Sequence, residues 1–216
     1  MGEGYLESTS KAYGASAARF AEVVGVSITG EFETAEDKAA LANFADHIPN
    51  GGLVVDAGCG PGRIARFLAD HGGRDVRGFD IAPGMIDVAR TAHPDLRFEC
   101  APLTAFPVED RSAAAVVYWY SIITTPPAQL SAIWAELDRV LTPTGRVLVS
   151  FQAGGGESEL RTNAYGTETD LTLYRHDPAF VSSTLKSAGF AIDSLTRRPP
   201  QLEHETTDQA IITCHR

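Results

Sequence analysis

The stretch VVDAGCGPGRIARFLAD, residues 54–70, decides how the chain folds. Apolar residues lead to an aspartate, glycines follow at positions 58, 60 and 62, and a helical pattern begins directly after them. Glycines let a backbone approach a ligand with no Cβ in the way, and a helix N-terminus offers free N–H groups. The stretch therefore predicts a strand, a ligand-binding turn and a helix.

Outward from this turn, apolar strands alternate with helices. Strands are expected at residues 53–56, 76–80, 96–100, 113–120 and 146–152, and helices at residues 62–70, 83–92 and 127–141. This alternation is typical of βαβ units, which build a mostly parallel sheet with helices on both faces. With closing strands at residues 190–196 and 209–214, we expect an α/β, Rossmann-like, doubly wound sheet of seven strands.

The regions on either side of this core have other patterns. Residues 5–47 are expected to form an N-terminal helical cap, interrupted at residues 25–30. A turn is expected at residues 142–145, before the fifth strand. The last third contains an extra strand at residues 169–174 and a helix at residues 177–188, with an aspartate as N-cap and a glycine as stop.

Composition limits the domain count and the partners. The chain has 216 residues, of which 44% are hydrophobic and 21% charged, as in ordinary globular proteins. The formal net charge of −10 repels phosphate backbones, so nucleic acid is not an expected partner. We expect a single domain over residues 1–216, with an N-terminal helical cap (residues 1–50), a cofactor-binding core (residues 51–152) and a C-terminal substrate-side portion (residues 153–216).

The cysteines and the N-terminal residues indicate a cytoplasmic location. Cys59, Cys100 and Cys214 form no C-x-x-C pair, which argues against a disulfide framework and against a metal site. The N-terminal residues contain no apolar signal-peptide region, and no apolar run reaches membrane-spanning length. We therefore expect a cytoplasmic protein with no metal and no membrane partner. A homodimer is compatible with the sequence, although no interface segment can be named.

An acidic residue in the second predicted strand limits which ligands the turn could bind. Asp80 ends that strand, 20 residues after Gly60, where an acid can accept hydrogen bonds from both hydroxyls of a ribose. The ligand is therefore expected to contain adenosine, as NAD and S-adenosylmethionine both do. The glycines follow G-x-G-x-G with Pro61 between the last two, unlike the G-x-G-x-x-G of NAD sites. Asp56 would repel a pyrophosphate and would suit a ligand with an ammonium group, which favours S-adenosylmethionine.

Three blocks of the sequence resemble the class I S-adenosylmethionine-dependent methyltransferases. They are the glycine stretch at residues 54–62, GFDIAPGM at residues 78–85 and LDRVLTPTGR at residues 137–146, in the family's order. The resemblance covers residues 5–151 well and the remainder in outline. It implies the Rossmann-like fold, S-adenosylmethionine as cofactor and a small-molecule methyl acceptor.

The resemblance also implies site residues. Asp80 would bind the ribose, and Ile81 and Met85 would flank the adenine. Tyr13 would close over the methionine end. Relatives often place an adenine-binding aspartate after the third strand, but Pro102 stands near that position here, which leaves backbone contacts. The expected cofactor-binding residues are Tyr13, Asp56, Gly58, Cys59, Gly60, Asp80, Ile81, Met85, Ala101, Leu103 and Trp119.

Two regions could supply catalytic groups. Trp119, Tyr120 and Ser121 follow the fourth strand, where the methyl group would lie, and aromatic faces there could attract a sulfonium. His176 lies beside the extra strand and is the residue type best suited to act as a base, whereas the other histidines, including His204, are expected in solvent. We expect Tyr120 and His176 to be catalytic. The competing interpretations are a buried aromatic strand and a surface histidine.

The predicted function is methyl transfer from S-adenosylmethionine to an oxygen, nitrogen or carbon nucleophile of a small molecule, by in-line displacement. Two alternatives stay open. A non-catalytic module that binds S-adenosylmethionine or S-adenosylhomocysteine would explain why Thr124 stands where relatives often carry a histidine. An NAD-dependent oxidoreductase would need a third dinucleotide glycine and a catalytic pair, and the sequence shows neither.

Overall fold

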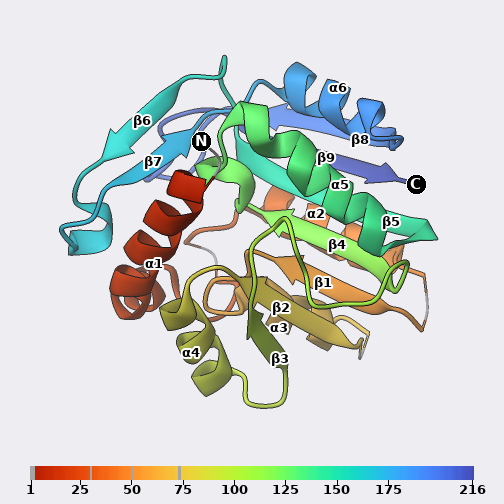
Figure 1. Cartoon of the computed structure of the whole chain (residues 1–216), viewed down its shortest axis with the longest axis horizontal. Coiled ribbons are helices and arrows are strands. Elements are labelled where there is room, and N and C mark those ends of the chain that lie inside the picture. The colour runs from red at the N-terminus through yellow and green to blue at the C-terminus, as the bar shows by residue number, and fades with distance from the viewer. Residues whose placement is uncertain (1–2, 30, 50, 73) are drawn as a thin grey trace.

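A computed structural model describes residues 3–29, 31–49, 51–72 and 74–216 (Figure 1). Within them, seven strands form one sheet in the order β3-β2-β1-β4-β5-β9-β8. They are β1 (Leu53–Ala57), β2 (Val76–Asp80), β3 (Arg97–Cys100), β4 (Ala113–Trp119), β5 (Leu141–Gln152), β8 (Ala191–Arg198) and β9 (Gln209–His215). The first five strands run parallel, and β9 is antiparallel to β5 and β8. The predicted Rossmann-like sheet of seven strands is confirmed.

Burial on both faces explains why the central strands are apolar. Every residue of β4 is buried, and from Ala115 to Trp119 its successive side chains alternate between two apolar clusters. The first cluster includes side chains of α5 (Leu130–Val140) and α6 (Pro178–Ser187). The second includes side chains of α2 (Ala35–Asp46), α3 (Arg63–Asp70) and α4 (Pro83–Ala92). Helices therefore cover both faces, as the alternating pattern predicted.

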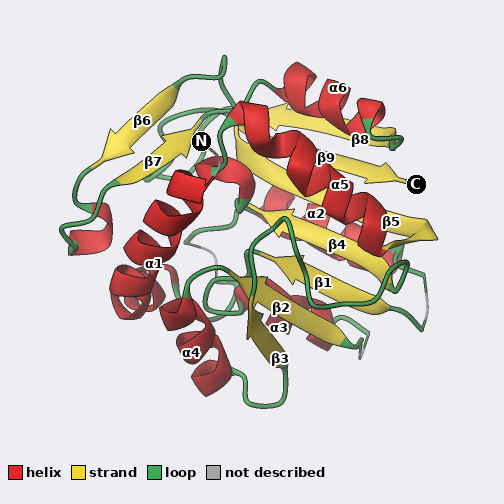
Figure 2. Cartoon of the chain, viewed as in Figure 1, coloured by secondary structure: helices red, strands yellow, loops and turns green. Residues whose placement is uncertain are grey.

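The sheet changes its direction of growth between β1 and β4. From β1 the chain adds β2 and β3 on one side and then crosses to β4 on the other. The carboxyl ends of β1 and β4 thus form a topological switch point, where open α/β sheets bind ligands. Helix α1 (Glu3–Val24) and the hairpin of β6 (Ser158–Arg161) and β7 (Leu171–Tyr174) lie beside this edge (Figure 2).

Helices α1 and α2 confirm the expected helical cap. Helix α1 packs closely on α4 because small residues meet there: a Cβ on Gly84 would lie 2.6 Å from the carbonyl oxygen of Gly14. Helix α2 begins at a capping box, in which Thr34 Oγ1 accepts from the Asp37 amide and the Asp37 carboxylate accepts from the Thr34 amide. Gly30, the last residue of the expected interruption, lies outside the described residues.

Three local expectations differ from the structure. Residues 142–145, expected as a turn, lie inside β5, where the register with β4 shifts. The helix expected from residue 127 begins with a 3-10 turn, η2 (Pro127–Gln129), and becomes α-helical only in α5. The extra strand is present as β7, but its partner β6 was not predicted because its four residues are all exposed and carry no apolar alternation.

Candidate functional site

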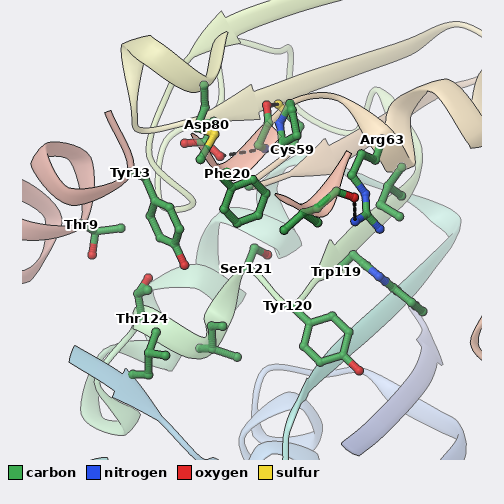
Figure 3. A pocket seen from close by; sticks show the side chains of 18 of the residues that line it. Thr9, Tyr13, Phe20, Cys59, Arg63, Asp80, Trp119, Tyr120, Ser121 and Thr124 are labelled. Atoms are coloured by element: carbon green, nitrogen blue, oxygen red, sulfur yellow. Dashed lines mark hydrogen bonds between the residues drawn. The ribbon is translucent and has the colours of Figure 1, made fainter. Parts of the chain in front are cut away.

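A cavity of about 420 Å³ lies at the switch point. Its lining comes from the glycine turn, the ends of β2 and β4, helix α1, and two segments far apart in the sequence, residues 32–33 and 204–205. Figure 3 shows Tyr13 on one side of it, Trp119 and Tyr120 on the other, and Asp80 with the glycine turn along a third. A volume of this size suits a small-molecule ligand.

Backbone hydrogen bonds fix the shape of the glycine turn. The amides of Gly58 and Cys59 both donate to the carbonyl oxygen of Phe79, at 2.7 and 2.9 Å. Gly58 has φ +75°, and an added Cβ would stand 2.3 Å from the Cβ of Ser121. Gly60 has φ +51°, and a Cβ there would meet no atom within 4 Å. The turn is therefore tight against the end of β4 at Gly58 and open at Gly60.

The Asp80 carboxylate joins the glycine turn to the start of α4. Its Oδ2 accepts a hydrogen bond from the Gly60 amide at 2.9 Å, and its Oδ1 accepts one from the Ala82 amide at 2.9 Å. Burial raises the pKa of Asp80, and these backbone bonds oppose the rise. Because a carboxylate offers about four lone-pair sites, it keeps the capacity to accept two further hydroxyl groups.

Asp56 does not line the cavity, which corrects the expectation that it faces an ammonium group. Its side chain is buried, and Oδ2 accepts from the amide of Ala65 at 2.8 Å, in the first turn of α3. Burial raises the pKa of Asp56 to about 7, with this hydrogen bond opposing the rise. Asp56 therefore stabilises the start of α3 from behind the turn. The sequence pattern does not distinguish that position from one facing a ligand.

The residues expected around the adenine divide into two groups. Ile81, Met85 and Leu103 all line the cavity beside Asp80. Ala101 does not: it is buried, and its amide donates to the carbonyl oxygen of Asp80 at 2.9 Å, which continues the pairing of β2 and β3. The expected contact between Ala101 and the ligand is therefore corrected.

Tyr13 belongs to a cluster of three rings that spans from α1 to the β6–β7 hairpin. The ring of Tyr13 lies 6.0 Å from that of Phe20 and 6.3 Å from that of Tyr165, and the last two lie 4.8 Å apart. All three side chains line the cavity. Burial raises the pKa of Tyr13, so its hydroxyl stays protonated and can donate a hydrogen bond. This aromatic cluster covers the cavity from the side of α1.

Trp119 and Tyr120 both line the cavity, although strict strand alternation would place only one of them there. Tyr120 leaves the strand in a left-handed conformation with φ +54°, and its amide donates to the carbonyl oxygen of Ser150. Such a conformation is strained for a residue with a Cβ and is common at functional sites. The two rings meet edge to face at 5.6 Å. Burial raises the pKa of Tyr120, and the charge of Asp37 adds to the rise.

His176 does not line the cavity, which corrects its expected place beside the acceptor. Its side chain is fully buried, and Nε2 lies 3.0 Å from the carbonyl oxygen of Ile122. Its backbone bridges to the end of β5 through the carbonyl oxygen of Gln152 and the amide of Gly154. Burial lowers the pKa of His176, and the bond to Ile122 opposes this. His176 is therefore neither on the surface nor on the cavity wall. Its hydrogen bonds connect the segment after β7 to the sheet.

The loop between β8 and β9 supplies cavity residues that sequence reasoning missed. His204 is exposed, as expected, but it also lines the cavity, and its ring lies 4.6 Å from that of Phe32. Glu205, beside it, forms an ion pair with Arg198. Because β9 is antiparallel to β5, this loop returns to the carboxyl edge of the sheet. Predicting the direction of β9 would have placed the loop at the site.

Comparison with known proteins agrees with the geometry of the turn. Residues 54–145 match the family model described as "Methyltransferase domain". Malonyl-[acyl-carrier protein] O-methyltransferase of Serratia marcescens is 36% identical over 110 residues, which are 51% of this chain and 42% of that protein. Over these residues the chain is similar to S-adenosylmethionine-dependent methyltransferase domains. It spans less than half the length of the curated relatives it matches first, from 28% to 46%.

Solved structures of methyltransferases and of one other enzyme share the fold. The 1,6-didemethyltoxoflavin-N1-methyltransferase of Burkholderia thailandensis superposes with a TM-score of 0.75 at 18% identity, over 100% of this chain and 90% of that chain. The [4+2]-cyclase SpnF superposes with a TM-score of 0.76 at 14% identity, over 98% and 96%. At such identities the likeness concerns the fold alone.

Two further observations concern metal ligands and membrane-spanning helices. Within the described ranges, no three His, Cys, Asp or Glu side chains gather as metal ligands would. No helix in the part of the chain that the structure describes is long and apolar enough to cross a membrane.

Proposed function

We propose that the chain transfers a methyl group from S-adenosylmethionine to a small molecule, at an oxygen, nitrogen or carbon nucleophile, by in-line displacement. The observation that carries the proposal is the Asp80 carboxylate beside the open face of Gly60 on one cavity. A ribose needs an acceptor for its two hydroxyls and a wall without a Cβ, and these residues supply both.

The residues present fit this cofactor. Asp80 would hold the ribose, and the apolar side chains of Ile81, Met85 and Leu103 would pack against the adenine. Tyr13, on α1, would cover the methionine end. When bound, S-adenosylmethionine supplies a methyl group on a sulfonium, which the acceptor's lone pair takes as the carbon–sulfur bond breaks. Because this donor is reactive by itself, positioning of the two partners accounts for most of the acceleration.

The chain's own contribution is positioning and exclusion of water. The aromatic cluster of Tyr13, Phe20 and Tyr165 closes the cavity from the side of α1. Trp119 and Tyr120 border it from the end of β4, and their rings would attract the positive charge of a sulfonium. A low-dielectric site strengthens that attraction.

Proton transfer is assigned to His204 in place of His176. The raised pKa of Tyr120 makes its hydroxyl a hydrogen-bond donor at neutral pH and not a base. His204 lines the cavity, and imidazole is the side chain best suited to accept a proton near neutral pH. His204 would take the proton released when a hydroxyl or ammonium acceptor is methylated.

The first test is a calorimetric titration of the purified chain with S-adenosylhomocysteine, with NAD as comparison. We expect binding of S-adenosylhomocysteine in the micromolar range and none of NAD. Binding of NAD alone would overturn the proposal, because it would mean that the turn accepts a pyrophosphate. Failure to bind either ligand would overturn it as well.

The second test separates catalysis from binding. Formation of S-adenosylhomocysteine is followed with a panel of phenols, amines and thiols as acceptors. Turnover with any of them supports a methyltransferase. Binding without turnover would favour a non-catalytic S-adenosylmethionine-binding module, because a shared fold does not fix the reaction and a named cyclase has this fold too.

A further inference from the structure

The part of the cavity beyond the glycine turn has aromatic walls. Tyr13 and Phe20 come from α1 and stand on one side, and Trp119 and Tyr120 stand on the other, with Ser121 between them (Figure 3). Phe32, from the segment between α1 and α2, adds a further ring to the lining. Rings from three separate parts of the chain therefore border the space left beside a bound cofactor.

Contacts between rings hold these walls in place. Trp119 and Tyr120 meet edge to face at an interplanar angle of 89°, and Tyr13 and Phe20 do so at 80°. Edge-to-face pairs fix the orientation of both rings. The walls are thus oriented before any acceptor enters, which favours a flat ligand that stacks or packs edge-on against them.

The charged side chains of the cavity wall are already paired within the protein. Among the described residues, Glu33 pairs with Arg63, Glu205 with Arg198, and Arg161 with Glu159. The first two pairs are nearly fully buried, and Arg161 lies at the exposed mouth with 42% of its side chain accessible. The remaining carboxylate, Asp80, accepts two backbone amides and faces the proposed ribose.

Each Glu and Arg that the described part of the chain places on the wall therefore has its counter-charge within the protein, and Asp80 is the remaining unpaired charge there. Burying a charge without a partner is far more costly than burying a neutral polar group. Three polar atoms of lining residues are buried and have no hydrogen-bond partner within the described residues: Trp119 Nε1, Ser121 Oγ and Glu33 Oε2, the last on the carboxylate that pairs with Arg63.

We propose that the methyl acceptor of this chain is an uncharged, flat aromatic or heteroaromatic compound. The inference rests on the proposed function, because it assigns the acceptor of that same site. It separates this chain from any methyltransferase that recognises its acceptor through a carboxylate or an ammonium group. The ring would lie between the α1 rings and the pair formed by Trp119 and Tyr120.

Three matched probes test the charge. Calorimetry in saturating S-adenosylhomocysteine, near neutral pH, compares 1-naphthol, 1-naphthoate and 1-naphthylmethylammonium. We expect 1-naphthol to bind about 10-fold more tightly than either charged probe, since each charged probe would be buried unpaired. Equal or tighter binding of either charged probe would overturn the proposal.

A saturated probe and one pair of variants test the aromatic walls. Decahydro-1-naphthol has the hydroxyl without the flat ring and should bind several-fold more weakly than 1-naphthol. Phe32→Leu should weaken the binding of 1-naphthol by about 3- to 10-fold, as expected when one pair of rings loses its contact. It should leave S-adenosylhomocysteine binding unchanged. The control is Phe180→Leu on α6, whose ring is exposed and lines no part of the cavity.

Failure of the inference differs from failure of the proposed function. If the wild-type chain binds S-adenosylhomocysteine but does not distinguish the four probes, the aromatic acceptor is wrong and the methyltransferase proposal stands. The same holds if Phe32→Leu and Phe180→Leu behave alike. If S-adenosylhomocysteine does not bind at all, both proposals are overturned together.

Discussion

The two ends of the cavity are held together in different ways. At the glycine-turn end, residues 56–62 and 79–85, backbone groups join neighbouring βα units, as when the Gly58 amide donates to the carbonyl oxygen of Phe79, 21 residues away. At the acceptor end, residues 31–37, 119–121 and 198–205, side chains join distant segments, as when Arg198 pairs with Asp37, 161 residues away. The order of the strands thus specifies the first end, whereas pairing of particular side chains specifies the second.

The acceptor end depends on a buried group that we call the Arg198 network, formed by Arg198, Asp37 and Glu205. The Arg198 Nη2 atom lies 2.7 Å from Asp37 Oδ2 and 2.6 Å from Glu205 Oε1. Burial tends to raise the pKa of Glu205, but Arg198 and two backbone amides lower it on balance. Because Asp37 also closes the capping box of α2, the network fixes the start of α2 against the loop that carries His204.

The largest effect is expected at the Arg198 network. Arg198→Met would leave two buried carboxylates without their cation, and we expect the free energy of unfolding to fall by about 3–5 kcal/mol. Chemical denaturation measures this change. The control is Arg197→Met, the neighbouring residue, whose side chain is 53% exposed in its pair with Asp208. An equal loss in both variants would show that the buried Arg198 network contributes no more to stability than an exposed ion pair does.

A smaller effect, on catalysis, is expected at His204. His204→Gln should lower kcat by about 100-fold with an acceptor that must lose a proton, and should change KM little. His71→Gln, whose side chain pairs with Asp46 outside the aromatic cavity, is the control. An unchanged kcat in His204→Gln would exclude His204 as the base.

At the opposite end, Asp80→Ala should weaken binding of S-adenosylhomocysteine by roughly 10- to 100-fold, because hydrogen bonds to a charged group contribute about 1.5–3 kcal/mol. Calorimetry gives the two dissociation constants. Asp87→Ala, an exposed acid on α4, should bind as the wild type does. An unchanged affinity in Asp80→Ala would remove the ribose assignment. Retained binding of 1-naphthol in this variant would show that the two ends act separately.

Gly60→Ala isolates the open face of the glycine turn. The left-handed backbone at Gly60 should reduce stability by about 1–2 kcal/mol once a Cβ is present. Gly189→Ala shares the positive φ and the free space around an added Cβ, so it should show the same strain far from the turn. Only Gly60→Ala should also weaken the binding of S-adenosylhomocysteine. The rise in Tm that the ligand causes measures this. Equal ligand shifts in both variants would contradict an open cofactor wall.

The smallest effect is the change that Asp56 causes in the free energy of unfolding between pH 6 and pH 7. The folded chain keeps the Asp56 proton up to about pH 7, whereas an unfolded chain loses it near pH 4. The stability from this proton is complete at low pH and is lost as pH rises, by about 1 kcal/mol between pH 6 and 7. Asp56→Asn can still accept from Ala65 and should lack this loss. Parallel pH profiles of the two proteins would show that Asp56 titrates normally.

The contrast between the two ends also explains what the sequence could predict. Strand order and the glycine turn follow from local patterns, so Gly58, Gly60 and Asp80 were located correctly beside the cavity. Asp56 and His176 have suitable residue types, but their side chains turn into the protein, and local patterns do not encode that direction.

Residues of the acceptor end carry little local signal. Phe32 and His204 reach the cavity only because α2 and the loop before β9 meet across the sheet edge. Tyr120 joins Trp119 there because one backbone angle is positive, which alternation along a strand does not predict. These placements depend on long-range pairing, so they become visible only in the folded chain.

The close crossing of α1 and α4 at Gly14 and Gly84 has a consequence for the timing of the reaction cycle. No side chain separates the two helices at this point, so α1 is seated directly on the adenine side of the cavity. The contacts among Tyr13, Phe20 and Tyr165 border the cavity beneath α1, so we expect them to open before a bound molecule leaves on this side. We therefore expect the rate of turnover to follow the opening of α1, with departure of the spent cofactor slower than the bond exchange itself.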